Sequence, residues 1–592
     1  ANNVALGVFS LCLNTTGGHG VGIGRSALQS NTTGCCNVGV GFAALLDNTE
    51  GDNNTAIGEC ALSNNTTADL NTAVGAFSLF TNTTGTKNTA VGKSSLASNT
   101  TGDCNTVLGV DALTNSTTGY NNVAIGVSAL ASNTIGNQSV AIGYKASCSN
   151  TEGFKNIAVG QCALLNNTTG DENTAIGFKS LMTGTDVKRN VAIGCHALCA
   201  NTANDNIAIG VEALKANTSG TSNTAVGRAA LLVNTTGTDN IALGRSALVK
   251  NTEGNCNTAV GGSNSLACNI TGGRNAALGH AALCSNTTAN NNTAVGVNAM
   301  LKNTTGSTHT ALGYWSLCNN VTGASNTAVG HGSLRNTTAD CNTGVGNDVL
   351  NAKTSGSNNT ALGTCALGVN TSGANNTAVS RNSLDAKTTG QKNTAVGQGA
   401  LGANTEANDN TAVGNSALTA NTTGGDNVAV GINSLLNNTT GSYNVAVGCN
   451  ALCTQTIATN NTAIGKNAGR SVTSGDENIM LGVDAGRSIS PFEVTDQDHR
   501  VVIGNNTVTN AYIKVAFTVT SDLRDKTNVE DIPHGLDYIL AIRPVKFDWD
   551  TRDGTRKGKK DYGFIAQELD QVEETFGNKE YTRLVSDRKS VV

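Results

Sequence analysis

Small apolar residues recur along most of the chain with a period of 17 positions. The glycine that closes each A-V-G or A-I-G triplet marks this period from Gly7 to Gly482, with Ser380 in its place once. The sequence thus contains 29 repeats of the consensus N-T-A-V-G-x-x-A-L-x-x-N-T-T-G-x-x. An α-helix does not produce a spacing of this kind, which is typical of a repeat protein. The step changes by one residue at three glycines: Gly210, Gly279 and Gly346.

Each repeat contains two short apolar runs and two turn signals. T-A-V is β-prone and ends at a glycine that lets the backbone bend, and A-L forms a second short run. N-T-T-G is typical of a turn, because Asn and Thr bond the local backbone and Gly accepts positive φ. We therefore predict two short strands per coil of a β-solenoid. With coils about 4.8 Å apart, the 29 repeats would form a rod roughly 140 Å long.

The apolar residues of one coil are too few to form a stable core. A coil offers about four small side chains, so only a stack of coils that share one core is stable. Half of the alternating Val and Ala positions also need a second surface to cover them. We therefore expect several chains to lie side by side.

Three versions of the strand motif resemble a known family. NTAVG, SVAIG (139–143) and NVAIG (190–194) are similar to the head repeats of trimeric autotransporter adhesins. The resemblance covers residues 1 to about 486 and implies a left-handed parallel β-roll with three chains in each head. We accordingly predict an all-β solenoid over residues 1–486.

Composition narrows the function classes. Only 4% of residues are aromatic and 13% charged, and the three prolines all lie in the last fifth of the chain, so the repeats do not look disordered. The net charge of −5 includes no basic run in the repeats, which argues against nucleic-acid binding. No apolar stretch approaches the length that a membrane-spanning helix needs, and the first residues do not form a signal peptide, so no transmembrane helix is expected.

Several features of the repeats have two interpretations. The glycine-dense segment GGHGVGIG (17–24) lacks the register of a phosphate-binding loop and follows the repeat. Sequons such as those at Asn14 and Asn31 are either glycan acceptors or turn residues stacked in ladders, and their periodicity favours ladders. Threonine columns also occur in ice-binding solenoids. The rod shows no recurring carboxylate pair and no metal-ligand spacing, so neither metal nor cofactor is expected.

All 17 cysteines lie in the repeats. Almost none shares its repeat position with a cysteine in the next coil, as a ladder of disulfides would require. We expect most to be free thiols that act as small apolar fillers, which favours assembly in a reducing compartment, although bonds between chains stay open. Six directly follow the leucine position: Cys12, Cys148, Cys199, Cys284, Cys318 and Cys453.

The repeat period ends near residue 487. Residues 487–520 are interpreted as a β-rich stalk or connector. From 521 to 592, 28 of 72 residues are charged, and the runs GLDYILAI and YGFIAQELDQVEE have helix-like apolar spacing. We predict a separate α+β module there.

Three ordered blocks of this module resemble the intramolecular chaperone domain at the C-terminus of endosialidase-type viral tailspikes and fibres. The blocks are S-D-x-R-x-K-T-N (521–528), G-L-D-x-I-L-x-I-R-P-V-x-F-x-W (535–549) and Y-G-F-I-A-Q-E-L (562–569). The resemblance implies a domain that trimerises, folds its fibre and then cuts itself off. It also implies that Ser521 is the nucleophile and Lys526 the general base, with the cut between Thr520 and Ser521.

The chemistry of this pair is reasonable by itself, because a neutral lysine can accept the serine proton when its pKa is lowered. A serine and a lysine at this spacing would otherwise be an ordinary surface pair. The family usually continues into a long C-terminal helix, whereas this sequence stops at Val592, so we expect an incomplete module. The enzyme activity expected is at most one self-cleavage per chain, without external substrates.

These observations favour a homotrimeric fibre or spike on a virus particle, either a phage tail fibre or a surface fibre of a large DNA virus. Its expected partners are two further copies and a host cell-surface receptor, with a glycan among the candidates, and neither nucleic acid nor a membrane. Its expected location is the virion surface or extracellular space after assembly in the host cytoplasm. The alternatives are a cellular surface adhesin or extracellular filament, and a polysaccharide depolymerase.

Overall fold

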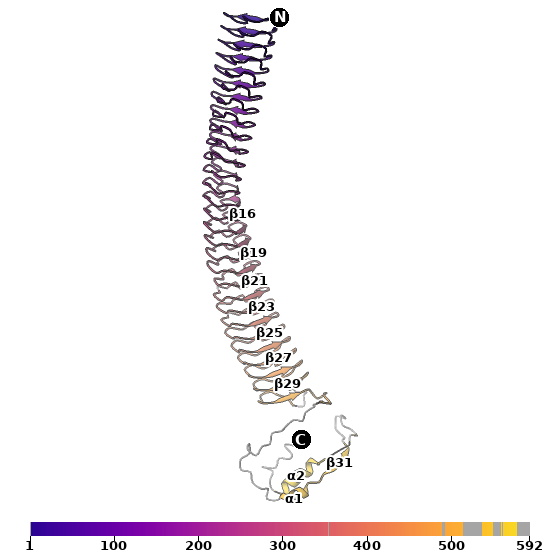
Figure 1. Ribbon diagram of the computed structural model, residues 1–592. Coiled ribbons are helices and arrows are strands. Elements are labelled where there is room, and N and C mark those ends of the chain that lie inside the picture. Colours follow the sequence, from indigo (N-terminus) through magenta and orange to yellow (C-terminus); the bar gives the residue numbers. More distant parts are fainter. Residues whose placement is uncertain are drawn as a thin grey trace. The chain divides into compact units, whose positions relative to one another are not determined.

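The computed structural model divides into two compact units, Ala1–Thr509 and Asn510–Val592. It describes residues 2–352, 354–386, 388–487, 492–512, 535–548, 558 and 560–576. The first unit is a long solenoid whose coils follow one another along its axis (Figure 1). The predicted β-solenoid with 17-residue coils is therefore confirmed.

The solenoid is built on one parallel sheet of 30 short strands, one from each coil. In a typical pairing, Thr55 lies opposite Thr72 and Ile57 opposite Val74, so identical repeat positions stack directly. The strands are β1 (Val4–Leu6), β2 (Val21–Ile23), β3 (Val38–Val40), β4 (Thr55–Ile57), β5 (Thr72–Val74), β6 (Thr89–Val91), β7 (Thr106–Leu108), β8 (Val123–Ile125), β9 (Val140–Ile142), β10 (Ile157–Val159), β11 (Thr174–Ile176), β12 (Val191–Ile193), β13 (Ile207–Ile209), β14 (Thr224–Val226), β15 (Ile241–Arg245), β16 (Thr258–Ser263), β17 (Ala276–Leu278), β18 (Thr293–Val295), β19 (Thr310–Leu312), β20 (Thr327–Val329), β21 (Thr343–Val345), β22 (Thr360–Leu362), β23 (Thr377–Val379), β24 (Thr394–Val396), β25 (Thr411–Val413), β26 (Val428–Val430), β27 (Val445–Val447), β28 (Thr462–Ile464), β29 (Ile479–Leu481) and β30 (Val501–Ile503).

The prediction of a second strand per coil was wrong. The A-L run is a turn, because its leucine adopts a left-handed backbone conformation that a strand excludes, with φ of 56° at Leu28. That conformation costs about 1–2 kcal/mol per residue, and burying a leucine side chain returns a similar amount. The Leu28 N–H still donates to the Ala44 carbonyl of the next coil over 2.9 Å, so the turns also stack.

The core is one narrow column of alanine and leucine side chains. Each coil contributes the central strand residue and both residues of the A-L turn, as in Ala56, Ala61 and Leu62, all fully buried. These residues form a continuous hydrophobic cluster along the solenoid. The shared core predicted from the repeat is confirmed, and its narrow width favours alanine at the central strand position, although Val107 and Met480 are also buried there.

Two buried asparagine columns hold the turns in register. In the first column, the Asn48 side chain donates to Asn31 Oδ1 in the preceding coil over 2.8 Å and to the Gly51 carbonyl of its own coil over 3.0 Å. In the second column, the Asn54 backbone N–H donates to Asn37 Oδ1 over 2.8 Å. Buried polar groups are stable when they are hydrogen-bonded in this way. The asparagine ladders predicted from the sequons are confirmed.

Four coils depart from the common length. The strand register advances by one residue fewer than usual from β12 to β13 and from β20 to β21, and by one residue more from β16 to β17. These are the three displaced glycines of the sequence. A longer coil then separates β29 from β30, where Ile479 lies opposite Val501, and it adds a last strand to the ladder inside the expected connector at 487–520. The connector boundaries themselves stay a prediction.

The described part of the second unit contains two helices and a hairpin: α1 (Gly535–Ala541), β31 (Val545–Asp548), β32 (Lys560–Gly563) and α2 (Ala566–Thr575). The hairpin is antiparallel, with Val545 opposite Gly563. These elements fall where helix-like spacing and the second and third family-like blocks stand in the sequence. None of the described helices is long and apolar enough to cross a membrane.

Candidate functional site

The predicted self-cleavage site lies outside the described residues. Thr520, Ser521 and Lys526 all fall within 513–534, so the Ser–Lys dyad and the cut between Thr520 and Ser521 stay predictions. The nearest described parts of the same module are α1, the β31–β32 hairpin and α2. Their contacts show how the other two family-like blocks are brought together.

The hairpin and an ion pair join the second and third blocks. Hairpin pairing places Lys546 opposite Tyr562. Arg543, just after α1, donates from Nε to Glu568 Oε2 in α2 over 3.1 Å, and its second nitrogen binds the other carboxylate oxygen. This hydrogen bond lowers the pKa of the Glu568 carboxyl. The two residues are far apart in the sequence and have no periodic signal, so the sequence pattern did not reveal the pair.

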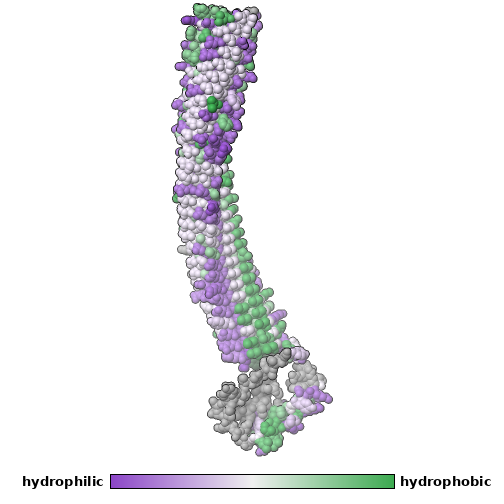
Figure 2. Space-filling view, viewed as in Figure 1, coloured by the Kyte–Doolittle hydropathy of each residue, from purple (hydrophilic) through white to green (hydrophobic). Residues whose placement is uncertain are grey.

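Helix α1 leaves most of its apolar side chains uncovered. Leu536, Ile539 and Leu540 are 72%, 63% and 72% exposed, and their spacing places them on one side of the helix. Only Tyr538 is buried, with its ring edge against Phe576 at a centroid distance of 5.7 Å. Exposed apolar surface of this kind marks a contact site in many proteins. Figure 2 shows hydrophobic residues at the surface of this unit.

The solenoid carries a second, much longer apolar surface. Because strand residues alternate, the first and third residues of each strand point away from the buried alanine. The third position is Val, Ile or Leu in all 30 strands, and none of these residues is buried within its own chain. We call this line of side chains the outward column. Figure 2 shows hydrophobic residues in a band along the solenoid.

The outward column is aliphatic in every coil, whereas the exposed position next to it along the chain is not. The position after the repeat glycine is also exposed, but there it varies from Phe42 to Lys93, Tyr144 and Asn415. A surface that only faces water tolerates such variation. The uniform aliphatic character of the outward column therefore makes it a candidate contact surface.

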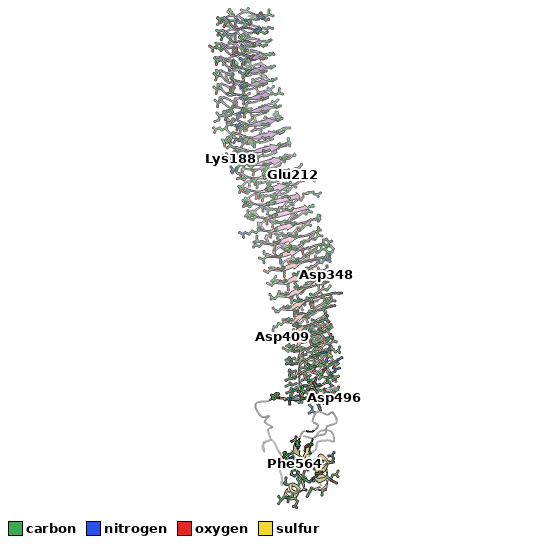
Figure 3. All side chains as sticks on the ribbon, turned by 90° about the vertical axis from the view of Figure 1, so that its right-hand side faces the viewer. Lys188, Glu212, Asp348, Asp409, Asp496 and Phe564 are labelled. Atoms are coloured by element: carbon green, nitrogen blue, oxygen red, sulfur yellow. The ribbon has the colours of Figure 1, made fainter. Side chains whose placement is uncertain are left out.

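One aromatic cluster stands out on the solenoid surface between β19 and β21. The ring of Tyr314 stacks on Trp315 at 4.6 Å and on His331 of the next coil at 5.4 Å. The Arg335 guanidinium lies 3.9 Å from the centre of the Trp315 ring. Asp348, labelled in Figure 3, lies 3.9 Å from His331 Nδ1. In the sequence, the single tryptophan of the repeats was the only signal for this cluster, and the repeat pattern did not draw attention to it.

The polar groups around this cluster are incompletely paired. Arg335 makes no ion pair with any described residue, and its Nε is buried without a hydrogen-bond partner in that part of the chain. Both amide atoms of Asn320 are likewise unpaired, and its Oδ1 lacks the donor of the next coil because Thr337 replaces asparagine there. The exposed part of the cluster, a cation over an aromatic ring, is suited to binding a ligand.

Apart from Asn14 and Asn336, the sequon asparagines of the N-T-T turns are buried inside the solenoid. Asn31 is 2% exposed, and its Nδ2 donates to both Asn14 Oδ1 and the Gly34 carbonyl. A glycan on that nitrogen would remove one of these bonds and displace the neighbouring coil. The segment GGHGVGIG likewise follows the repeat, with β2 at its end and Gly24 in the repeated glycine position.

The comparison with protein families identifies the C-terminal region. Residues 521–578 match the family described as chaperone of endosialidase. No curated protein shows significant similarity to the chain. The resemblance drawn from the three sequence blocks is thereby confirmed, and the match includes the whole hairpin and both helices of the described module.

Proposed function

We propose that this chain is the subunit of a homotrimeric virus fibre or spike that attaches the particle to its host. A β-solenoid followed by a chaperone of endosialidase fits a fibre or spike protein. The number of chains, the viral origin and host attachment go beyond that fit. Three chains are implied by the resemblance of both regions to trimeric proteins.

The outward column is the observation that carries the proposal. It offers one aliphatic side chain per coil through 30 coils, and covering each contributes on the order of 1 kcal/mol. In a trimer, each chain turns this column toward the common axis. The exposed apolar side of α1 supplies a further contact in the chaperone module, so the same three chains associate along their length.

Substitutions in the outward column test this arrangement. Replacing Ile125, Ile142 and Val159 together with threonine keeps the β-branched shape but removes apolar contact. We expect the native mass of the full chain to fall from three subunits toward one, or the assembly to dissociate at a concentration at least tenfold higher. Tyr144→Thr is the matched control, because Tyr144 is exposed in the same region but lies outside the column. An unchanged trimer in the triple variant contradicts the proposal.

The chaperone solves a register problem of the rod. A slip of one whole coil preserves nearly every contact because consecutive coils are alike. A C-terminal module that first joins three chain ends sets a common starting point. Once the coils have closed, the rod is held by many slow-opening contacts and no longer needs the module.

Self-cleavage would then make assembly irreversible. Ser521 Oγ attacks the carbonyl carbon of Thr520 while the Lys526 amine takes the hydroxyl proton. The peptide C–N bond breaks as an ester forms, and the proton passes to the departing nitrogen. Water hydrolyses the ester and leaves a rod that ends at Thr520. The chain acts on itself once and on no external substrate.

The aromatic cluster is the proposed receptor contact on the rod. Its stacked rings and the Arg335 guanidinium over Trp315 suit a ligand that combines a ring with polar or anionic groups, as glycans do. We expect Trp315→Ala to lower binding of assembled rods to host cells at least tenfold, whereas Tyr144→Ala, an exposed aromatic elsewhere, leaves it unchanged. Equal binding by both variants excludes this contact.

The viral origin has a direct test. Antibodies against the rod should label the surface of purified particles, and mass spectrometry of those particles should detect the chain. Detection on the cell envelope and not on particles would instead support a cellular adhesin or filament.

A further inference from the structure

Two cysteines are hydrogen-bonded to each other across neighbouring coils. The backbone N–H of Cys268 donates to the carbonyl of Cys284 over 2.9 Å. Among the 17 cysteines, all of which lie in described coils, no other pair is joined in this way. Cys284 directly follows Leu283, and Cys268 lies two residues after Leu266; both leucines are buried in the stacked core. The two cysteine backbones are therefore held side by side by the fold.

The separation suits a disulfide. The hydrogen bond joins stacked turns of two neighbouring coils, and the coils of a β-solenoid lie about 4.8 Å apart. Disulfides form at α-carbon separations of about 4.4–6.8 Å without moving the backbone. Both side chains are half-buried, so they are neither sealed in the core nor fully in solvent. The pair also lies beside the one lengthened step within the regular repeats, from β16 to β17.

The surroundings keep the Cys284 thiol mainly protonated in the folded rod at neutral pH. Burial raises the pKa of the Cys284 thiol, and contact with the Cys268 thiol raises it further, whereas nearby Lys250 opposes the shift. A raised pKa leaves little Cys284 thiolate at neutral pH, and the thiolate is the reactive species. Oxidation of the folded pair is therefore expected to be slow at neutral pH and to become faster as the pH rises.

We propose that Cys268 and Cys284 form a disulfide that staples two coils of the finished rod in an oxidising medium. Both S–H bonds break and one S–S bond forms. The two electrons reduce a low-molecular-weight disulfide, such as oxidised glutathione, to two thiols, which also take up the two protons. The staple requires only the folded solenoid, so it is independent of the proposed viral role.

Other neighbouring cysteines do not offer the same bond. Cys195 and Cys199 lie in one coil, as do Cys449 and Cys453, so a bridge there would join no coils. Cys148 and Cys162 lie in successive coils, but the Cys162 N–H donates to Tyr144 and not to Cys148. These pairs serve as internal controls, because selective oxidation should leave them reduced while Cys268 and Cys284 become linked.

Peptide mapping of the full chain tests the proposal. Arg274 lies between the two cysteines, so trypsin separates residues 251–274 from 275–302 unless a disulfide links them. After incubation of the folded, reduced protein with oxidised glutathione, we expect the linked peptides in a product of single-chain mass. The disulfide should form about tenfold faster for each unit by which the pH is raised, as long as the attacking thiol is mainly protonated.

Cysteine variants assign the bond. Peptide 251–274 also contains the exposed Cys256. Cys256→Ser should retain the linked peptides, whereas Cys268→Ser and Cys284→Ser should each abolish them. Circular dichroism confirms that the variants are folded, and chain unfolded in guanidinium should lose the selectivity. Separate peptides in folded wild type after oxidation, or a link that survives Cys268→Ser, would overturn the proposal.

Discussion

The rod and the C-terminal module stabilise their structures by opposite means. In the rod, every coil repeats the same contacts, with alanine and leucine inside and asparagine side chains linked from coil to coil. In the described part of the module, few residues are buried, and specific contacts such as Arg543–Glu568 and Tyr538–Phe576 occur once. Repetition provides extent and stability but no unique alignment between chains. The module contains the unique contacts that an alignment requires.

Among the changes considered, removal of the C-terminal module should have the largest effect on assembly. We expect a chain ending at Thr520, made without residues 521–592, to give aggregates or misaligned oligomers in place of a uniform trimer. The cause is the near-equivalence of registers that differ by one coil. Native mass spectrometry would measure the number of chains in each oligomer, and electron microscopy of rod lengths would detect misaligned chains. A stable, correctly wound product at full yield would remove the chaperone from the assembly mechanism.

Substitution of the Ser521–Lys526 dyad should show that alignment of the three chains does not depend on cleavage of the module. Ser521→Ala or Lys526→Ala is expected to abolish cleavage but leave the trimer assembled, because neither change removes apolar contact. Denaturing gels should show one full-length band for each variant and a rod ending at Thr520 for the complete wild-type chain. Ser586→Ala, a serine change elsewhere in the module, serves as the control. Equal cleavage in all of these proteins would exclude the dyad.

A break in an asparagine column should have a smaller, local effect. Asn150 donates to Asn133 Oδ1 and the Gly153 carbonyl and accepts from Asn167, so Asn150→Ala leaves two buried acceptors unpaired and removes one of the two hydrogen bonds of the Asn167 amide. We expect a loss of about 2–3 kcal/mol, seen as faster amide exchange in the adjoining coils. Asn150→Thr should cost less, because Thr354 occupies this column naturally and accepts from Asn370. If amide exchange in both variants equals that of the wild-type protein, the asparagine column does not stabilise the rod.

The exposed ion pair of the module should have the smallest effect. Because Arg543 lowers the pKa of Glu568 in the folded state, its contribution is present above the carboxyl's ordinary pKa and is lost as the pH falls through the lowered value. Glu568→Gln should therefore slightly increase amide exchange in α2 at pH 7 and change nothing under acid conditions. Gln567→Ala, at an exposed position of the same helix, is the control. A larger effect at low pH would contradict this account.

Periodicity predicted the rod well and the module only in outline. Identical spacing specified the coil, the alanine core and the asparagine ladders, because a stacked repeat turns sequence period directly into contact. The second strand was wrong because alternation at A-L cannot reveal the left-handed conformation of residues such as Leu28. The Arg543–Glu568 pair and the Trp315 cluster join residues from different segments. Such contacts depend on packing, which no local pattern encodes.

The similarity of successive coils has an evolutionary consequence. Each coil offers the same hydrogen-bonding edge above and below, so gain or loss of one complete coil leaves its neighbours with chemically familiar partners. Unequal recombination within the gene would thus change the reach of the protein in increments of about 4.8 Å while a distant surface feature stays intact. Length becomes a trait that natural selection can adjust without redesigning the fold.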